Sequence, residues 1–203
     1  MPSQKYFNQL FTLYAPLYPW ISRLFRLGRK KQIESIVRII NIESMRVLLV
    51  GGGDGVDIPY FPKNAQIVYL DAAKGMVNKA KRKFGKRPKI TFIHEDINQY
   101  KEETKFDAVC LHFCLSVTSN PESMLKNAAD LIKESGVLSI IDASDNKLKK
   151  TNRWVNTFTK WSMFDLNTNI ERLIDRTELN LQLVEKNVLS EVKLFNSFIY
   201  KRI

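Results

Sequence analysis

The chain has few cysteines and no long apolar run, and each shortage excludes a class of protein. Only Cys110 and Cys114 occur among 203 residues, four positions apart on one apolar segment. This spacing indicates two small buried core residues rather than a disulfide. No run of 18 apolar residues is present, which argues against a membrane-spanning helix, and the first residues lack the apolar stretch of a secretory leader. We therefore expect a cytoplasmic protein in a reducing compartment.

Acidic residues are scarce at the beginning of the chain. None precedes Glu34, and the whole sequence holds 32 Lys and Arg against 21 Asp and Glu, a net charge of +11. Such a charge favours polyanionic partners, such as nucleic acid or an anionic membrane surface. A second basic cluster lies between Lys79 and Lys89, and its simplest interpretation is a solvated helix end and loop.

Two further absences narrow the chemistry. The two histidines and two cysteines lie in apolar runs and do not form a set of metal ligands, so no metal is predicted. The sequence also has no G-x-x-x-x-G-K-[ST] loop, which excludes a Walker-type phosphate site.

The most informative segment is an apolar run that ends in glycines, Val47-Leu-Leu-Val-Gly51-Gly-Gly53-Asp54-Gly55. Sixteen residues later, a second apolar run ends in Asp71. Glycines let the backbone turn sharply and approach a ligand, and a carboxylate at the next strand tip can accept both hydroxyls of a ribose. The dinucleotide fingerprint G-x-G-x-x-G needs a glycine at position 56, where this chain has Val56. The pattern predicts a nucleotide-type cofactor site at the lip of a parallel sheet.

Strand and helix patterns alternate through the rest of the chain, which predicts one α/β domain. The expected fold is a doubly wound, Rossmann-like, mostly parallel seven-stranded sheet with a C-terminal antiparallel hairpin and N-terminal helices. Residues 1–45 form a helical lead-in or lid, and residues 46–203 form the main part of the same domain. Strands are expected at 46–50, 66–70, 90–93, 106–112 and 137–141, helices at 74–84, 121–134 and 170–176, and a hairpin at 181–189 and 192–201.

The lead-in contains an amphipathic helix pattern. Five apolar residues recur with helical spacing, and arginines flank them: Leu17, Trp20, Ile21, Leu24 and Phe25. A basic, aromatic helix of this kind suits peripheral contact with an anionic membrane. Packing of the same stripe on the domain is the alternative. The inward side of a second helix is expected to consist of Ile33, Ile36, Val37 and Ile40.

Taken in order, these motifs resemble those of class I S-adenosylmethionine-dependent methyltransferases. Val47–Gly55 is similar to their glycine motif, Val68–Asp71 to their ribose-binding strand and Glu95–Ile97 to their adenine-contacting turn. Phe106–Val109 and Leu131–Ile141 are similar to their fourth strand and to the helix, turn and strand that follow it. The resemblance covers about residues 44–203, and it implies S-adenosylmethionine as cofactor and methyl transfer as the reaction.

Within that family, the chain resembles small bacterial phospholipid N-methyltransferases and quinone-biosynthesis methyltransferases. Leu13–Tyr18 is similar to the segment that opens those proteins, and Leu115–Pro121 to their loop after the fourth strand. Phe164–Leu173 and Lys193–Phe195 are more similar to the phospholipid branch. The resemblance implies a small-molecule acceptor that is amphiphilic or membrane-derived, such as a phospholipid or a quinone.

The resemblance and the strand-tip positions together give the expected site. Cofactor contacts are expected from Gly51, Gly53, Asp54, Gly55, Asp71, Ala72, Met76, Asp96, Ile97 and His112. Asp71 would accept bonds from the ribose hydroxyls, Asp96 would accept from the adenine amino group, and Asp54 would meet the cofactor's ammonium or sulfonium.

Methyl transfer mainly requires that the acceptor be aligned, and a general base helps only when the acceptor must lose a proton. The catalytic candidates are His112 as that base, Asp142 at the tip of the fifth strand, and Tyr18 as a residue that closes over the cofactor. A structural role is the alternative for each of the three.

Two other functions stay open. Leu49 stands where the family usually has an acidic residue that helps to hold the cofactor's amino group, which leaves a basic nucleic-acid-binding protein without turnover as an alternative. The Asn/Asp-Pro-Pro-Tyr signature of amino-group nucleic-acid methyltransferases is absent, which disfavours nucleic acid as acceptor. The glycine string is also similar to that of polyamine synthases, which transfer an aminopropyl group. Those enzymes carry carboxylates near the end of the fourth strand, where this chain has Leu111–Cys114.

Overall fold

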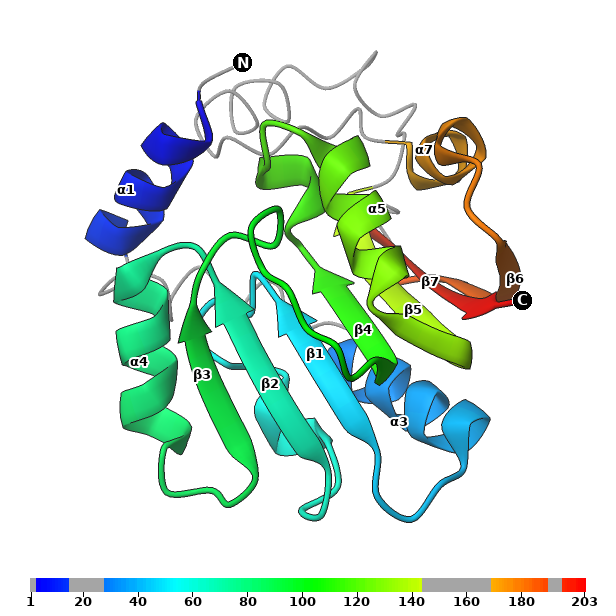
Figure 1. Cartoon of the computed structure of the whole chain (residues 1–203), viewed down its shortest axis with the longest axis horizontal. Helices are drawn as coiled ribbons and strands as arrows, with labels where there is room; N and C mark the ends of the chain where they lie inside the picture. The colour runs from blue at the N-terminus through cyan, green and yellow to red at the C-terminus, as the bar shows by residue number, and fades with distance from the viewer. Residues whose placement is uncertain (1–2, 15–27, 144–168, 190–194) are drawn as a thin grey trace.

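A computed structural model describes residues 3–14, 28–143, 169–189 and 195–203. Seven strands form one sheet in the order β3-β2-β1-β4-β5-β7-β6 (Figure 1). Their bounds are Arg46–Val50 (β1), Gln66–Asp71 (β2), Ile90–His94 (β3), Phe106–His112 (β4), Ile132–Ala143 (β5), Leu181–Val188 (β6) and Phe195–Arg202 (β7). The first five strands are parallel, and β7 runs antiparallel to both β5 and β6. The expected fold class is confirmed.

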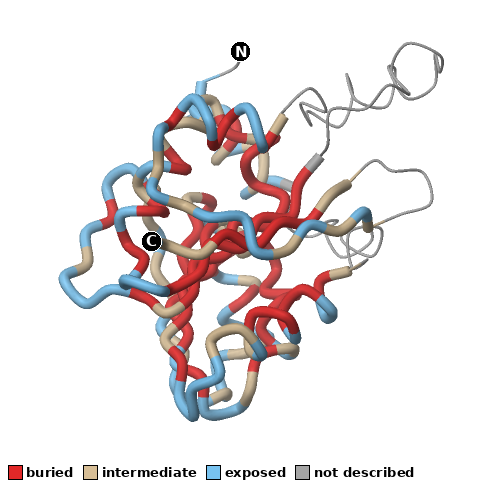
Figure 2. The backbone as a smooth tube through the Cα atoms, turned by 90° about the vertical axis from the view of Figure 1, so that its right-hand side faces the viewer, coloured by how far each residue is buried: buried red, intermediate tan, exposed pale blue. Residues whose placement is uncertain are grey.

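The centre of the sheet is apolar on both sides because it is covered on both sides. β1 has β2 as one neighbour and β4 as the other, so the order of the strands reverses at this point. All but the first residue of β1 are buried, as parallel central strands require. In Figure 2 the buried backbone follows the strands, and most of the exposed backbone lies in the outer helices and loops.

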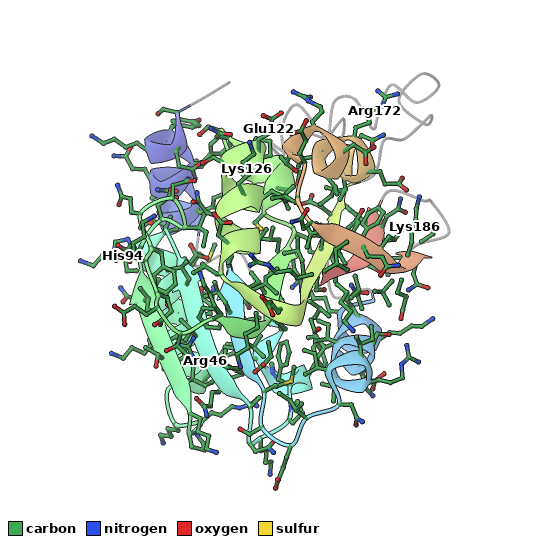
Figure 3. All side chains as sticks on the ribbon, turned by 45° about the vertical axis from the view of Figure 1, so that its right-hand side comes forward. Arg46, His94, Glu122, Lys126, Arg172 and Lys186 are labelled. Atoms are coloured by element: carbon green, nitrogen blue, oxygen red, sulfur yellow. The ribbon has the colours of Figure 1, made fainter. Side chains whose placement is uncertain are left out.

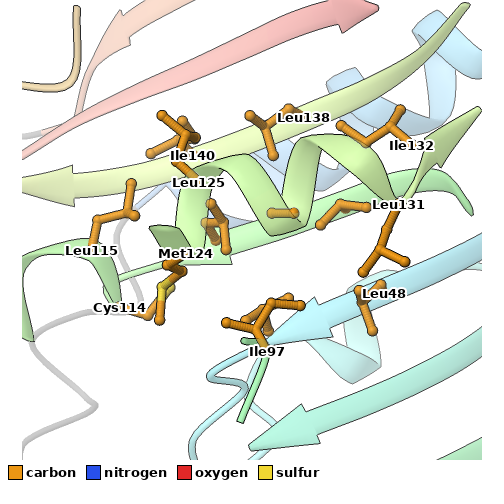
Figure 4. Close-up of a cluster of buried hydrophobic side chains, with 14 of the residues drawn as sticks. Leu48, Ile97, Cys114, Leu115, Met124, Leu125, Leu131, Ile132, Leu138 and Ile140 are labelled. Atoms are coloured by element: carbon orange, nitrogen blue, oxygen red, sulfur yellow. The ribbon is translucent and has the colours of Figure 1, made fainter. Parts of the chain in front are cut away.

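Helices form a layer on each face of the sheet. The helices are Gln4–Tyr14 (α1), Arg29–Ile40 (α3), Lys74–Phe84 (α4), Pro121–Asp130 (α5) and Ile170–Thr177 (α7). One core cluster joins α5 and α7 to alternate residues of the strands, and it includes Leu125 of α5, Leu48 of β1 and Leu138 of β5 (Figure 4). The other cluster joins α3 and α4 to the opposite face. There Ile33 and Ile36 of α3 are fully buried, as their spacing predicts.

The helix after β4 is shorter than predicted. It was expected to continue to Glu134, but α5 ends at Asp130 and β5 begins at Ile132, five residues before the expected start of the strand. The guanidinium of Arg202 donates to the carbonyl oxygens of Ala129 and Ile132, at 3.0 and 2.7 Å, and so caps the helix end from the last strand. The register of β5 against β4 then shifts between the pairs of Phe106 and Ala108.

Several expectations concern residues outside the described ranges. These are the apolar stripe from Leu17 to Phe25, Tyr18, and the start of the last strand before Phe195. The edge strand β6 is described, and its Lys186, labelled in Figure 3, pairs with Glu171 of α7 at 2.8 Å. Within the described ranges, no helix is long and apolar enough to cross a membrane.

Candidate functional site

A pocket opens where the strand order reverses, at the carboxyl ends of the parallel strands. This is the position at which open α/β sheets bind ligands. Its empty volume is about 710 Å³, including open solvent at its mouth. Six segments line it: the tip of β1, the tip of β2 with the start of α4, the turn after β3, the loop after β4, the start of α5, and one side of α1.

The glycine loop forms the floor of the pocket. Gly51 and Gly53 both line it and both have a positive φ, 60° and 57°, a conformation that only glycine adopts readily. A β-carbon on Gly51 would lie 2.9 Å from the β-carbon of Cys114, so the loop packs directly on the tip of β4. Gly55 also has a positive φ but does not line the pocket.

Asp71 lies at the tip of β2 and lines the pocket, as the sequence predicts. Its Oδ2 accepts from the Gly53 N–H at 3.0 Å and its Oδ1 from the Ala73 N–H at 2.8 Å. Burial raises the pKa of Asp71 to about 6, although bonds from Ala73, Gly53 and Tyr69 act in the opposite direction. A carboxylate in this state gains from further donors such as ribose hydroxyls.

The walls beside Asp71 suit a flat, partly polar ring. Met76 and Ile97 are buried and line the pocket, and the half-buried Phe11 packs on Met76. Asp96 also lines it, and its Oδ1 caps the turn by accepting from the N–H of Asn98 at 2.9 Å. Asp96 therefore stabilises this turn, and its second carboxylate oxygen is left for a ligand. These groups fit an adenosine with Asp71 at its ribose.

Helix α1 contributes side chains to the pocket that the sequence did not predict. Gln4, Asn8 and Phe11 line the pocket from this helix. Oε1 of Gln4 accepts from the Thr118 hydroxyl at 3.0 Å and from the Ser119 N–H at 3.1 Å, which ties α1 to the loop after β4. The available signal was the helical spacing of Phe7 and Phe11, but no sequence pattern states which surface such a helix covers.

His112 does not have the position expected of a general base or a cofactor contact. It is buried and absent from the pocket lining. Its Nδ1 lies 3.0 Å from Oδ2 of Asp57 and its Nε2 lies 2.9 Å from Oγ of Ser139. Both ring nitrogens are engaged inside the protein, so we correct the expectation and treat His112 as a structural residue.

Asp142 and Asp54 are corrected in the same way. Oδ2 of Asp142 accepts from the N–H groups of Leu115 and Ser116, at 2.8 and 3.2 Å, and so holds the loop after β4. Asp54 has no exposed surface, and its Oδ2 pairs with Nζ of Lys83 at 2.8 Å. Neither residue lines the pocket. Leu49 is buried in the core on the α3 side of the sheet. β1 contains no acidic residue that could hold the amino group of the cofactor.

Comparison with known proteins agrees with this geometry. Residues 47–136 match a family model described as "Methyltransferase domain". This part of the chain is therefore similar to methyltransferase domains.

Two curated methyltransferases are similar to parts of this chain. A malonyl-[acyl-carrier protein] O-methyltransferase of Ilyobacter polytropus is 26% identical over 47% of this chain and 38% of its own length. The tRNA 5-carboxymethoxyuridine methyltransferase of Escherichia coli K12 is 25% identical over 55% of this chain and 45% of its own length. The chain thus spans less than half of these two relatives.

Among solved structures, the N-methyltransferase NodS of Bradyrhizobium japonicum WM9, in complex with S-adenosyl-L-homocysteine, has a TM-score of 0.69 and 14% identity. The match covers 91% of each chain, and it establishes a common fold.

Proposed function

We propose that this protein transfers a methyl group from S-adenosylmethionine to an apolar or amphiphilic small molecule. The observation that carries the proposal is the buried Asp71 at the wall of a pocket floored by Gly51 and Gly53. S-adenosylmethionine supplies an electrophilic methyl group on a positively charged sulfur. The chain's own residues would bind the adenosine through Asp71, Asp96 and Met76, and would exclude water with α1.

An apolar cluster beside the pocket supports the class of acceptor. Phe113 lines the pocket and packs with Ile141, and the half-buried Leu189 and Phe195 pack against this pair. The rings of Phe113 and Phe195 meet edge to face, with centroids 5.2 Å apart. All four residues lie at the carboxyl edge of the parallel strands, where an acceptor must approach the methyl group. An acceptor with an apolar body would bury surface here.

A transfer assay tests the proposal. Purified protein is incubated with S-adenosylmethionine labelled in the methyl group and with a lipid and quinone extract, and labelled products are separated. We expect label in an organic-soluble product, and none with Asp71→Ala. Label that enters only RNA or a carrier protein would overturn the proposed acceptor class but not methyl transfer.

Contact with a membrane surface is a separate part of the proposal. It rests on the basic, aromatic pattern around Trp20, which lies outside the described residues. We expect the protein to sediment with vesicles that contain anionic phosphatidylglycerol and not with vesicles of phosphatidylcholine alone. Equal and negligible sedimentation with both would count against this part.

Nucleic-acid binding is the second candidate, and one observation favours it. The segment 72–94 contains eight basic residues and no acidic one. Lys74, Lys81, Arg82, Lys86 and Lys89 of this segment are exposed, and the described part of the chain offers them no ion-pair partner. Binding of RNA that weakens steeply with salt, in protein that binds no S-adenosylhomocysteine, would favour this candidate over methyl transfer.

A further inference from the structure

Phe113 combines an unusual backbone conformation with a place in the pocket wall. It follows β4 directly and lines the pocket, and its φ is 60°. A bulky residue is disfavoured in this left-handed region and stays there only where its surroundings hold it. Strain of this kind is concentrated at sites where a side chain must be aimed. The contacts that hold Phe113 therefore bear on the reaction.

Two contacts hold Phe113 from behind the pocket. Its N–H donates to the carbonyl oxygen of Ile141 at 2.6 Å, which fixes the backbone against β5. The guanidinium of Arg29, the first residue of α3, lies 4.7 Å from the centroid of the Phe113 ring. A guanidinium at this distance attracts the face of an aromatic ring.

Arg29 is itself held by a buried carboxylate. It is only 4% exposed, and its guanidinium donates to Oδ2 of Asp57 at 2.6 Å. The same oxygen lies 3.0 Å from Nδ1 of His112, and Nε2 of His112 lies 2.9 Å from Oγ of Ser139. Gln32 continues the chain by donating to that same hydroxyl at 3.0 Å. The network joins α3, the segment after the glycine loop, β4 and β5.

The network connects the two loops that face each other across one end of the pocket. Asp57 lies two residues after Gly55 of the glycine loop, and His112 immediately precedes Phe113 at the tip of β4. The loops touch where Gly51 meets Cys114. Apolar side chains would fill this space at a smaller desolvation cost than a buried ion pair. The pair therefore has a use beyond packing, and the loops it spans indicate what that use is.

We infer that Arg29, Asp57 and His112 form a positioning unit that holds Phe113 and the glycine loop at the spacing required by the amino-acid end of S-adenosylmethionine. The inference rests on the proposed function. Asp71, Asp96 and Met76 lie on β2, after β3 and on α4, whereas the unit lies on α3, after the glycine loop and on β4. We therefore expect the unit to act mainly on the sulfur-bearing end of the ligand, although Asp71 accepts from Gly53 of the loop.

A variant that damages the whole fold would weaken the binding of S-adenosylhomocysteine and of adenosine alike. A selective loss of S-adenosylhomocysteine binding therefore tests the positioning role. Binding of S-adenosylhomocysteine is measured by calorimetry, and binding of adenosine by NMR titration, for the wild type and for Arg29→Met. We expect Arg29→Met to weaken S-adenosylhomocysteine binding by about tenfold and to change adenosine binding by less than about twofold. Arg29→Lys keeps the charge without the planar guanidinium, and its loss should be intermediate.

Two further variants complete the design. Phe113→Leu removes the ring but leaves the ion pair intact, so it keeps the inference testable if Arg29→Met does not fold, and it should show the same selective loss. Arg38→Met breaks an exposed pair with Glu185 on the same helix and should change neither affinity.

Three results would contradict the inference. Loss of S-adenosylhomocysteine and adenosine binding to the same extent in Phe113→Leu would overturn the positioning role, and so would no loss of either. If the wild type binds neither ligand, the proposed function fails first, and the inference fails with it.

Discussion

Two buried aspartates at the same edge of the sheet have opposite electrostatic environments. Asp71 at the tip of β2 is 8% exposed, and burial raises its pKa to about 6. Asp57 beside the tip of β4 is 3% exposed, and burial also acts to raise its pKa. There, Arg29 and His112 outweigh burial and hold the pKa well below its usual range.

The difference in pKa indicates that the two carboxyl groups have different roles, with Asp71 suited to ligand binding and Asp57 to holding the structure. Asp57 is paired with a buried cation, so its charge is compensated within the protein. In the part of the chain that the structure describes, only backbone N–H groups and the Tyr69 hydroxyl donate to Asp71. A buried carboxylate that lacks a cation in the free protein is stabilised when a ligand brings donors. This difference supports the proposals that Asp71 binds the ligand and that Asp57 positions the loop.

Breaking the ion pair of Arg29 and Asp57 should produce the largest effect. Arg29→Met leaves the Asp57 carboxylate buried without its main partner, and we expect the free energy of unfolding to fall by about 3 kcal/mol. The measurement is urea unfolding followed by circular dichroism. Arg38→Met, in an exposed pair, should cost less than about 1 kcal/mol. Equal losses in the two variants would contradict the scaffold role.

Removing the binding carboxylate should act on affinity instead. Asp71→Ala loses a charged acceptor for two hydroxyls, and we expect S-adenosylhomocysteine binding to weaken about 100-fold or more. The matched control is Asp130→Ala, an exposed aspartate at the end of α5. Calorimetry checks both, and an Asp71→Ala affinity within threefold of the wild type would contradict the assignment.

The two aspartates should also respond oppositely to pH. The pKa of Asp71 is raised from 3.8 to about 6, so its contribution to stability is present below 3.8 and lost as pH rises through 6. The pKa of Asp57 is lowered from 3.8, so its contribution is present above 3.8 and lost as the pH falls further.

Since we propose that the ligand binds ionised Asp71, S-adenosylhomocysteine affinity should fall about tenfold between pH 7 and pH 5. Calorimetry at both values measures the fall. Asp96→Asn should keep this dependence, and its disappearance in that variant would assign the titration to Asp96.

The smallest expected effect comes from α1. Gln4→Ala removes the acceptor that ties the helix to Thr118 and Ser119. We expect S-adenosylhomocysteine to dissociate about threefold faster, because the half-buried Gln4 side chain contributes only a few neutral hydrogen bonds. Stopped-flow displacement measures the rate, with Gln182→Ala on β6 as the control. An unchanged rate would show that α1 does not restrain the ligand.

The sheet and Asp71 were predictable because their signals are local. Apolar runs set the strands, and a carboxylate at the end of such a run must lie at the sheet's edge. The direction of a side chain at that edge is not local. His112 was expected to face the pocket, but its neighbours Phe113 and Cys114 line it, while His112 bonds to Asp57 and Ser139.

Tertiary contacts account for the remaining differences. The end of α5 depends on Arg202, about 70 residues away in the chain. The place of α1 over the pocket depends on hydrogen bonds that Gln4 accepts from residues more than 100 positions away. No pattern within either segment contains this information.

The most direct measurement is the titration of the Asp71 carboxyl group, followed by carbon-detected NMR in the free protein and with saturating S-adenosylhomocysteine. The free group should titrate near pH 6, and the bound group should remain ionised to well below pH 5, because the ribose hydroxyls donate to it. A carboxyl group that titrates at the same pH with and without the ligand would contradict the account.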